Sequence, residues 1–279
     1  MDFTTIVVDL GDDAARPARI ATAARIAART AGTVVGLTAT GTRLEPFRGA
    51  GEQAGQYASL AASHLHKLVA SHKEALDSPT SQISPGVATR HVVMDTESGW
   101  ALAEQGRYAD LILPAPPAAE ADVPALMAAG AEYAMLNAGR PILLVPSHRG
   151  PDLGGHAAIA WNGGREAARA VADALPWLLH ASAVSVLAVS AGKRRPMEEQ
   201  AYRDSANRLV AWLATHGVHA SVRTGEGDPD LVLPQLAREA GADLLIAGGY
   251  GRSRLQELVL GGTTRALLRQ QGLAVFMSH

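Results

Sequence analysis

The chain has 279 residues, enough for two domains or one large one, and 47% hydrophobic with 19% charged residues is the composition of an ordinary globular protein. A net charge of −2 argues against a nucleic-acid-binding surface, and the lack of cysteine excludes disulfides, thiolate metal sites and cysteine nucleophiles. The first residues form neither a signal peptide nor a long apolar run, so we expect a soluble, cytoplasmic protein without a membrane segment.

Two parts of the sequence share one order of predicted elements. A short apolar run that ends in Asp9 precedes an alanine-rich helical segment and a second apolar run at residues 33–39. The same order recurs from the apolar run that ends before Asn162 to the run at residues 183–189. A repeated order of elements indicates a duplicated unit.

The later parts of the two copies match as well. The matched pairs are YADLILPAP (108–116) with GADLLIAGG (241–249), and PILLVP (141–146) with AVFMSH (274–279). Both pairs are separated by the same interval along the chain, whereas Asp9 and Asn162 lie further apart. The first copy therefore has about 20 additional residues around 43–85, and the part GEQAGQYASLAASHLHKLVASHKEAL is long enough for an extra helix that covers the first copy or meets a partner.

Solid apolar strands that alternate with helices predict a parallel sheet covered on both faces. The fold class is therefore α/β, with two tandem, doubly wound, Rossmann-like domains. The Gly- and Pro-rich stretch 147–155 separates them, which gives domains at 1–148 and 154–279.

A glycine-rich stretch, GGYGRSRLQELVLGGTT, covers residues 248–264. In a doubly wound sheet, ligands bind at the carboxyl ends of the strands where the strand order reverses. Asn162, Val189 and Gly248 are expected at such strand ends. Glycine N–H groups could cradle a phosphate chain there, or the glycines could form two tight turns and nothing more.

This stretch resembles the G-x2-G-x9-G-[ST] signature of universal stress proteins, with Gly248, Gly251 and Gly261 at the glycine positions. AIAWNGGREAARA is similar to the first strand and helix of the family, and ADLLIAGG to its fourth strand. The resemblance covers nearly the whole chain as two copies, so the sequence looks like a tandem universal stress protein.

The resemblance implies that ATP or a related adenine nucleotide binds in the C-terminal half, with Mg²⁺ on its phosphates. The residues ending the first and second strands would face adenine and ribose, and the glycines would face phosphate. The implied nucleotide contacts are Asn162, Val189 (through its backbone), Gly248, Gly251, Arg252, Gly261, Gly262 and Thr263.

Three residues depart from the family pattern in this half. Gly262 stands where the family has Ser or Thr, so Thr263 or Thr264 would have to supply the hydroxyl. Asn162 stands where the family has Asp, and the bulky Trp161 beside it would narrow or block the adenine site.

The first half is expected to be an empty, structural copy. Asp9 takes the acid position, but alanine replaces glycine at all three phosphate positions, and alanine cannot adopt the same backbone conformations without strain. These alanines are Ala115, Ala118 and Ala128.

Other candidate residues receive structural interpretations. His64, His66 and His72 are taken as a solvated helix face, because residues i and i+2 do not share a face and a zinc site needs three or four ligands. The three other tryptophans are expected in the core or at an interface: Trp100, Trp177 and Trp212.

The sequence contains no Walker A motif, dinucleotide fingerprint or nucleophile–base pair, so catalysis is not expected. Together with the resemblance, this makes a non-catalytic stress-response module the first hypothesis. A nucleotide-free scaffold for a protein partner is the alternative, and an ATP-dependent hydrolase or transferase is the third. Since family members pair through their last strands, PILLVP and AVFMSH are expected to join the halves as an intramolecular pseudo-dimer. Pairing of two chains into a homodimer is left open.

Overall fold

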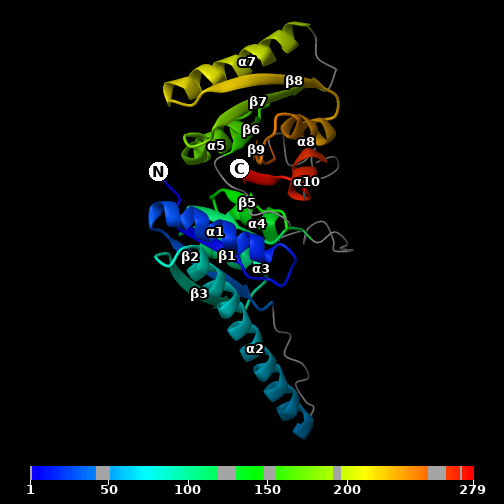
Figure 1. The fold of residues 1–279 in the computed structure, drawn as a ribbon. Coiled ribbons are helices and arrows are strands. Elements are labelled where there is room, and N and C mark those ends of the chain that lie inside the picture. The colour runs from blue at the N-terminus through cyan, green and yellow to red at the C-terminus, as the bar shows by residue number, and fades with distance from the viewer. Residues whose placement is uncertain are drawn as a thin grey trace.

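The computed structural model describes residues 2–41, 51–117, 130–147, 155–190, 196–250, 262–270 and 272–279. Its strands are stacked along the long axis of the molecule, and helices cover both faces (Figure 1). The inner strands consist mainly of buried Val, Ile, Leu and Ala residues, as expected for a sheet covered on both faces.

The first half supplies five strands and four helices of the described chain. They are β1 (Thr5–Asp9), α1 (Arg16–Thr30), β2 (Thr33–Ala39), α2 (Gly51–Ile83), β3 (Ala88–Met94), α3 (Ser98–Gly106), β4 (Leu111–Leu113), α4 (Gly130–Asn137) and β5 (Ile142–Leu144).

The second half repeats this order with one additional short helix, α6. Its described elements are β6 (His156–Ala160), α5 (Arg165–Asp173), α6 (Leu175–Leu178), β7 (Ala183–Ser190), α7 (Pro196–Thr215), β8 (Ala220–Glu226), α8 (Pro229–Glu239), β9 (Leu244–Gly248), α10 (Gly262–Leu268) and β10 (Ala274–Ser278). Proline stands in the first turn of α1 and of α8, where its missing N–H costs no helical hydrogen bond.

One sheet joins the described strands in the order β3-β2-β1-β4-β5-β10-β9-β6-β7-β8. Neighbouring strands within each half are parallel, so the fold class predicted from the sequence is confirmed. β5 and β10 pair antiparallel, with Val275 opposite Leu144 and Phe276 opposite Leu143. The expected joining of PILLVP and AVFMSH is therefore confirmed. The strand order reverses between β1 and β4, and again between β6 and β9.

The two faces of the sheet carry different helices. One buried cluster contains residues of α1, α2, α5, α6 and α7, and the other contains residues of α3, α4, α8 and α10. In the first cluster Phe3 lies 5.1 Å from the Trp177 ring, and Trp177 lies 5.2 Å from Phe276, so aromatic packing crosses the junction of the halves. Trp177 is thus a core residue as expected, whereas Trp100 and Trp212 are exposed.

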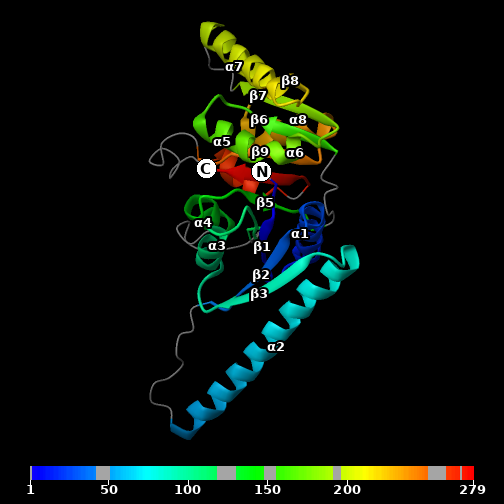
Figure 2. The same cartoon turned by 90° about the vertical axis from the view of Figure 1, so that its left-hand side faces the viewer.

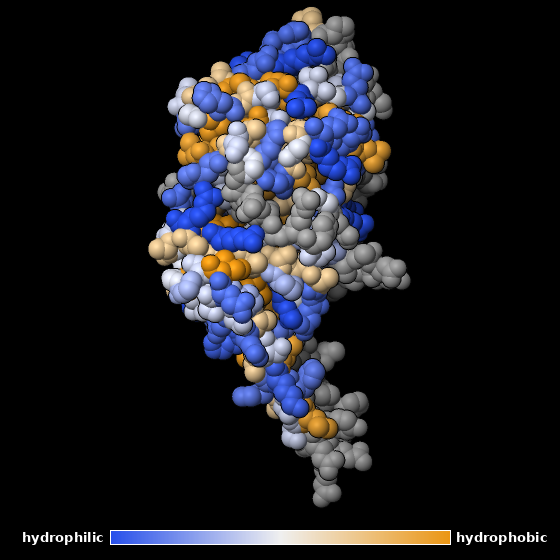
Figure 3. All heavy atoms as spheres, viewed as in Figure 1, coloured by the Kyte–Doolittle hydropathy of each residue, from blue (hydrophilic) through white to orange (hydrophobic). Residues whose placement is uncertain are grey.

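The additional residues do not form an extra helix in the described chain but lengthen an existing one: α2 has 33 residues against 20 in α7, its counterpart between the second and third strands of the other half. Leu76 near its C-terminal end is fully buried, but Leu60 is 66% exposed. The other end of α2 extends beyond the rest of the molecule (Figures 1 and 2), and the surface view shows it as a narrow projection (Figure 3). No helix of the described residues is long and apolar enough to cross a membrane.

An aspartate precedes the fourth strand in both halves and binds the start of the first strand. The Oδ2 atom of Asp110 accepts hydrogen bonds from the Thr4 and Thr5 amides, each at 2.9 Å, and from the Thr4 hydroxyl at 2.8 Å. Burial alone would raise the pKa of Asp110, but these hydrogen bonds outweigh it and the pKa is lowered. Burial raises the pKa of Asp243, its counterpart, more than the backbone amides of His156 and Gly155 lower it.

We therefore expect Asp110→Asn to lower the free energy of unfolding by about 1–2 kcal/mol at pH 7, and Asp243→Asn to cost less. A lowered pKa in the folded state stabilises the protein above the unfolded pKa of 3.8, and this contribution is lost as the pH falls through the folded value. The raised pKa of Asp243 acts in the opposite direction, so its carboxylate costs stability as the pH rises. Urea unfolding of both variants at pH 7 and pH 3 measures the loss of stability in each. An equal loss in the two variants that does not change with pH would contradict the opposite pKa shifts of Asp110 and Asp243.

Candidate functional site

The carboxyl edge of the sheet between β6 and β9 is the candidate site. β6 pairs with β7 only as far as Ala160 opposite Leu187, whereas β7 continues to Ser190. Val189 therefore lies on β7 beyond the last β6–β7 pair, and its side chain is buried. Asn162 follows β6 by two residues, and Gly248 ends β9. The structure thus brings the three predicted strand-end residues to the same edge, at the point where the strand order reverses.

Asn162 has a local structural role at this edge. Its side chain is exposed, and its Oδ1 atom accepts a hydrogen bond from the Gly164 amide at 2.8 Å. This turn leads directly into the first residue of α5, which is how Asn and Asp side chains commonly start helices. An Asp at this position could make the same contact, so the turn itself does not require the carboxylate of the family pattern.

Trp161 is held against α7. Its Nε1–H donates to the Ser205 hydroxyl at 3.1 Å, and its carbonyl accepts a hydrogen bond from the Tyr202 hydroxyl. The indole packs against the core cluster on the α5 and α7 face of the sheet. The narrowing of the adenine site that the sequence predicts would therefore come from a ring fixed by α7.

Gly248 is required by packing between β9 and α5. A Cβ atom at this position would lie 2.4 Å from the Glu166 carbonyl carbon and 2.5 Å from the Ala167 nitrogen. Both are backbone atoms of a helix, so neither can move without displacing α5. Packing against α5 therefore explains why this residue is glycine, whether or not it contacts a phosphate.

The remaining predicted contacts follow β9 in the chain. Three of them lie outside the described residues: Gly251, Arg252 and Gly261. Gly262 begins α10, and a Cβ there would lie 2.2 Å from the Asp230 Oδ2 atom, so a carboxylate lies beside the position where the family has a hydroxyl. Thr264 is buried and its hydroxyl accepts the Tyr250 N–H at 3.2 Å, whereas Thr263 is only half-buried.

Glu166 is a residue of this edge that the sequence analysis missed. Its carboxylate is 4% exposed; the Arg165 side chain donates to Oε1, and Oε2 has no partner among the described residues. Burial alone would raise the pKa of Glu166, but the hydrogen bond from Arg165, together with the charge of that guanidinium, holds it below its ordinary value. The residue whose backbone packs on Gly248 therefore carries a half-satisfied carboxylate, and its Oε2 atom lies 3.4 Å from where a Cβ on Gly164 would be. The sequence shows only an acidic residue in the first turn of a helix, which is usually a solvated position.

The first half differs from the expected alignment at Asp9. Leu111 of β4 pairs with Ile6, and its counterpart in the second half, Leu244 of β9, pairs with Ala157. Ile6 and Ala157 are therefore equivalent positions of the two first strands. On this register Asp9 corresponds to Ala160, and Gly11 corresponds to Asn162. The expectation that Asp9 takes the acid position is therefore wrong by two positions.

Asp9 instead fills the crevice of its own half. It is 5% exposed, and its carboxylate accepts hydrogen bonds from the Gly11 amide at 2.9 Å and the Ser98 hydroxyl at 2.7 Å. The amide of Ala115, the counterpart of Gly248, also points at it from 3.5 Å. The carboxylate thus occupies the place where the resemblance would put an anion. The other two alanines of the predicted degenerate motif lie outside the described residues: Ala118 and Ala128.

A buried arginine fixes the loop that follows Asp9. Arg19 is completely buried; its Nε donates to the Asp9 carbonyl at 2.9 Å, and its Nη1 and Nη2 groups donate to Asp13 at 3.1 and 2.8 Å. On the register of the two first strands its counterpart is Ala170, which is equally buried. The two halves therefore share a fold but differ in the buried residue below the loop after the first strand, which is Arg19 in one and Ala170 in the other.

The interpretation of the histidines as a solvated face is wrong for His72. His64 and His66 are exposed, but His72 is 4% exposed and its Nδ1 lies 2.9 Å from the Thr38 hydroxyl, which also contacts His91 Nε2 at 2.8 Å. Burial, followed by the charge of His72, lowers the pKa of His91. The C-terminal part of α2 packs on the body of the protein, and this packing buries His72.

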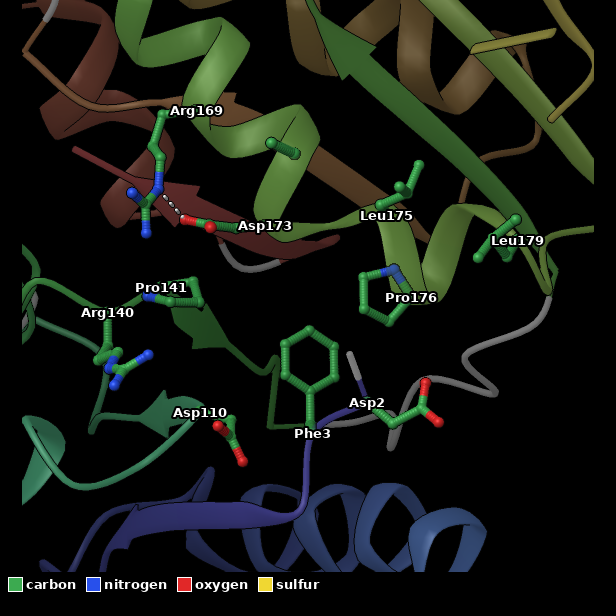
Figure 4. Close-up of a pocket in the computed structure, with 11 residues that line it drawn as sticks. Asp2, Phe3, Asp110, Arg140, Pro141, Arg169, Asp173, Leu175, Pro176 and Leu179 are labelled. Carbon is green, nitrogen blue, oxygen red and sulfur yellow. Dashed lines mark hydrogen bonds and ion pairs between the residues drawn. The ribbon is translucent and has the colours of Figure 1, made fainter. Parts of the chain in front are cut away.

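A cavity of about 230 Å³ lies at the opposite edge of the sheet, where the halves meet. Phe3, Pro141 and Pro176 form its apolar part, and Arg169 pairs with Asp173 at its rim (Figure 4). Its charged lining residues carry both signs, so the cavity has no evident preference for one charge. They are Asp2, Asp110, Arg140, Arg169 and Asp173.

Comparison with known proteins identifies the family of the C-terminal half. Residues 156–278 match the sequence model of the Universal stress protein family. The C-terminal half is a universal stress protein domain. A comparison with curated protein sequences gives no match.

Solved structures extend the likeness to the whole chain. A universal stress protein from Archaeoglobus fulgidus DSM 4304 superposes with a TM-score of 0.68 at 12% identity, over 98% of this chain and 95% of that one. A protein of unknown function from Pseudomonas aeruginosa PAO1 gives a TM-score of 0.62 at 18% identity, over 99% and 92% of the two chains. The chain therefore has the tandem fold of a universal stress protein, as the resemblance predicted, and the N-terminal half shares that fold.

Proposed function

We propose that the universal stress protein domain of the C-terminal half binds an adenine nucleotide, ATP or a relative of it, at the edge between β6 and β9. The protein would act as a non-catalytic stress-response module in the cytoplasm. The observation that carries the proposal is the meeting of Asn162, Val189 and Gly248 at the switch point of the sheet, where doubly wound folds bind their ligands.

The proposed roles follow the strand ends. The exposed Asn162 side chain and the Val189 backbone face adenine and ribose, since β7 extends beyond β6 at this point. The chain after Gly248 faces the phosphates, with Thr263 as the hydroxyl near Gly262. The proposed contacts Gly251, Arg252 and Gly261 complete this set.

Mg²⁺ fits the donor set of this edge. Glu166 has a buried carboxylate oxygen without a partner among the described residues, and carboxylate oxygen is a preferred Mg²⁺ ligand. No group of three or more acidic or histidine side chains in the described part of the chain could hold a metal ion by itself. The ion would therefore arrive with the nucleotide, which supplies phosphate oxygens, while Glu166 offsets its charge.

Isothermal titration of the purified protein with ATP, with and without Mg²⁺, tests the proposal. We expect micromolar binding of ATP·Mg²⁺ and weaker binding of metal-free ATP, because the Glu166 carboxylate repels bare phosphates. Glu166→Gln should weaken ATP·Mg²⁺ binding about tenfold and strengthen metal-free binding. Glu104→Gln, on an exposed position of α3, is the matched control and should change neither.

Two results would count against this function. Failure of the folded wild-type protein to bind ATP, AMP or ADP at millimolar concentration would contradict nucleotide binding and favour the alternative of a nucleotide-free scaffold. Such a scaffold has one supporting feature, the projecting part of α2 with Leu60 on its surface. Equal effects of Glu166→Gln with and without metal would contradict the role of Mg²⁺.

The first half, in this proposal, is a structural copy. Its Asp9 carboxylate already accepts the hydrogen bonds of the corresponding crevice. We propose domain limits of 1–148 and 154–279, with the two domains paired through β5 and β10 as an intramolecular pseudo-dimer. Further pairing of two chains as a homodimer is compatible with this arrangement.

A further inference from the structure

The chain just after β9 contacts the other half of the molecule. A Cβ atom on Gly249 would lie 2.7 Å from the methyl carbon of Met135 on α4, so glycine allows α4 to approach this backbone closely. The next residue, Tyr250, donates its hydroxyl hydrogen to the Glu132 carboxylate, also on α4. The two residues are 118 positions apart in the sequence. A helix of the first half therefore touches the start of the glycine-rich stretch of the second half.

Tyr250 has an unusual backbone conformation that these contacts hold. Its φ angle is +53°, in the left-handed region that residues other than glycine seldom adopt. Its N–H donates to the Thr264 hydroxyl on α10, and the neighbouring Gly249 N–H donates to the Ser278 carbonyl at 2.8 Å. The backbone that leads into the side-chain contact is thus anchored within the second half, while the hydroxyl is anchored in the first.

The surroundings of the Tyr250 hydroxyl favour its hydrogen bond to Glu132. Burial raises the pKa of Tyr250, and the hydrogen bond to Glu132 raises it further. The nearby Arg265 lowers the pKa of Tyr250, but by less, so the phenol keeps its proton and donates it to the carboxylate. Hydrogen bonds to a charged acceptor are stronger than those between neutral groups.

We propose that Glu132 and Tyr250 are positioning residues, through which the first half holds residues 248–250, at the end of β9, in place for nucleotide binding. The inference rests on the proposed function. Backbone that is already held at residues 248–250 loses less conformational entropy on binding than free backbone, so breaking the contact lowers affinity without removing any atom that touches the ligand. The first half would then contribute to the ligand site without binding ligand itself.

Titration with ATP·Mg²⁺ across a double-mutant cycle tests this coupling. We expect Tyr250→Phe and Glu132→Ala each to weaken binding about tenfold, and the double variant to weaken it no further, because both remove the same hydrogen bond. Glu132→Gln keeps an acceptor oxygen and should retain most of the affinity. Tyr108→Phe and Glu104→Ala, both on exposed side chains of the first half, are the matched controls and should bind as the wild type does.

Amide hydrogen exchange without nucleotide gives a second, independent readout. Residues 244–250 should exchange faster in Tyr250→Phe and Glu132→Ala than in the wild type and the controls. If the wild type binds no nucleotide but exchange increases, the proposed function fails and the positioning contact stands. Unchanged exchange, unchanged or increased affinity, or additive effects in the double variant would each overturn the proposal.

Discussion

Replacing Gly248 with alanine is expected to lower the free energy of unfolding by about 3 kcal/mol, at the upper end of the cost of overpacking a core. The added methyl group would lie 2.4–2.7 Å from three backbone atoms of Glu166 and Ala167 in the first turn of α5. Backbone in a helix cannot rotate away as a flexible side chain can, so α5 would have to shift along the sheet. Urea denaturation measures the loss as a lower midpoint at constant slope.

Gly86 provides the matched control for this substitution. It lies in the turn before β3, its φ angle is not in the left-handed region, and nothing lies within 4 Å of a Cβ built on it. Gly86→Ala should therefore change stability by less than about 0.5 kcal/mol. A Gly248→Ala protein as stable as the control would show that the gap between β9 and α5 is wider than the structure has it.

This expectation also limits which variants can test nucleotide binding. Valine or alanine at Gly248 would abolish binding by unfolding the site, whether or not the glycine ever contacts phosphate. Glu166→Gln avoids this problem, because it replaces one carboxylate oxygen by an amide nitrogen of similar size. Its opposite effects with and without Mg²⁺ have no counterpart in a loss of folding.

The second large effect is expected for Arg19→Ala, which should cost about 3–5 kcal/mol. The substitution removes a completely buried guanidinium, leaves the Asp9 carbonyl and the Asp13 carboxylate without their donors, and opens a cavity beside β1. Lysine should rescue only part of the loss, since a single ammonium group cannot reproduce the bidentate contact with Asp13.

Arg25→Ala is the control for the buried arginine. Arg25 lies on the exposed side of the same helix, and its removal should cost less than about 0.5 kcal/mol. Thermal and urea unfolding of the three arginine variants would measure the difference. Equal stability of Arg19→Ala and Arg25→Ala would mean that the loop after β1 does not depend on the buried ion pair.

The sequence predicted those features of the fold that arise from local patterns and from duplication. Apolar runs and helical periodicity identified the strands, and the matched pairs at one constant interval predicted that 141–146 and 274–279 end the two halves. Their pairing through β5 and β10 then followed from the resemblance. The helix in 43–85 was predicted from its length, but its periodicity could not show which part would project and which would bury His72.

The errors and omissions at the site have physical causes. Asp9 was matched to Asn162 because both follow an apolar run and precede glycine, whereas hydrogen-bond register between strands, which a sequence does not display, matches Asn162 with Gly11. The contact between Glu132 and Tyr250 depends on how α4 of one half packs against the other, and no local pattern encodes it. The sequence analysis attributed Gly248 to conformational freedom of the backbone, but glycine is required there because α5 leaves no room for a Cβ atom.

The antiparallel pairing of β5 with β10 has a consequence for how the two copies respond to dilution and to mutation. Two separate chains that associate through such strands separate when their concentration falls, and every mutation appears on both sides of their symmetric contact. Here both strands belong to one polypeptide, so the association is intramolecular and its strength does not depend on how much protein the cell makes. Each copy can also accumulate substitutions separately. One copy is therefore free to lose its ligand chemistry while it still serves as the permanent folding partner of the other.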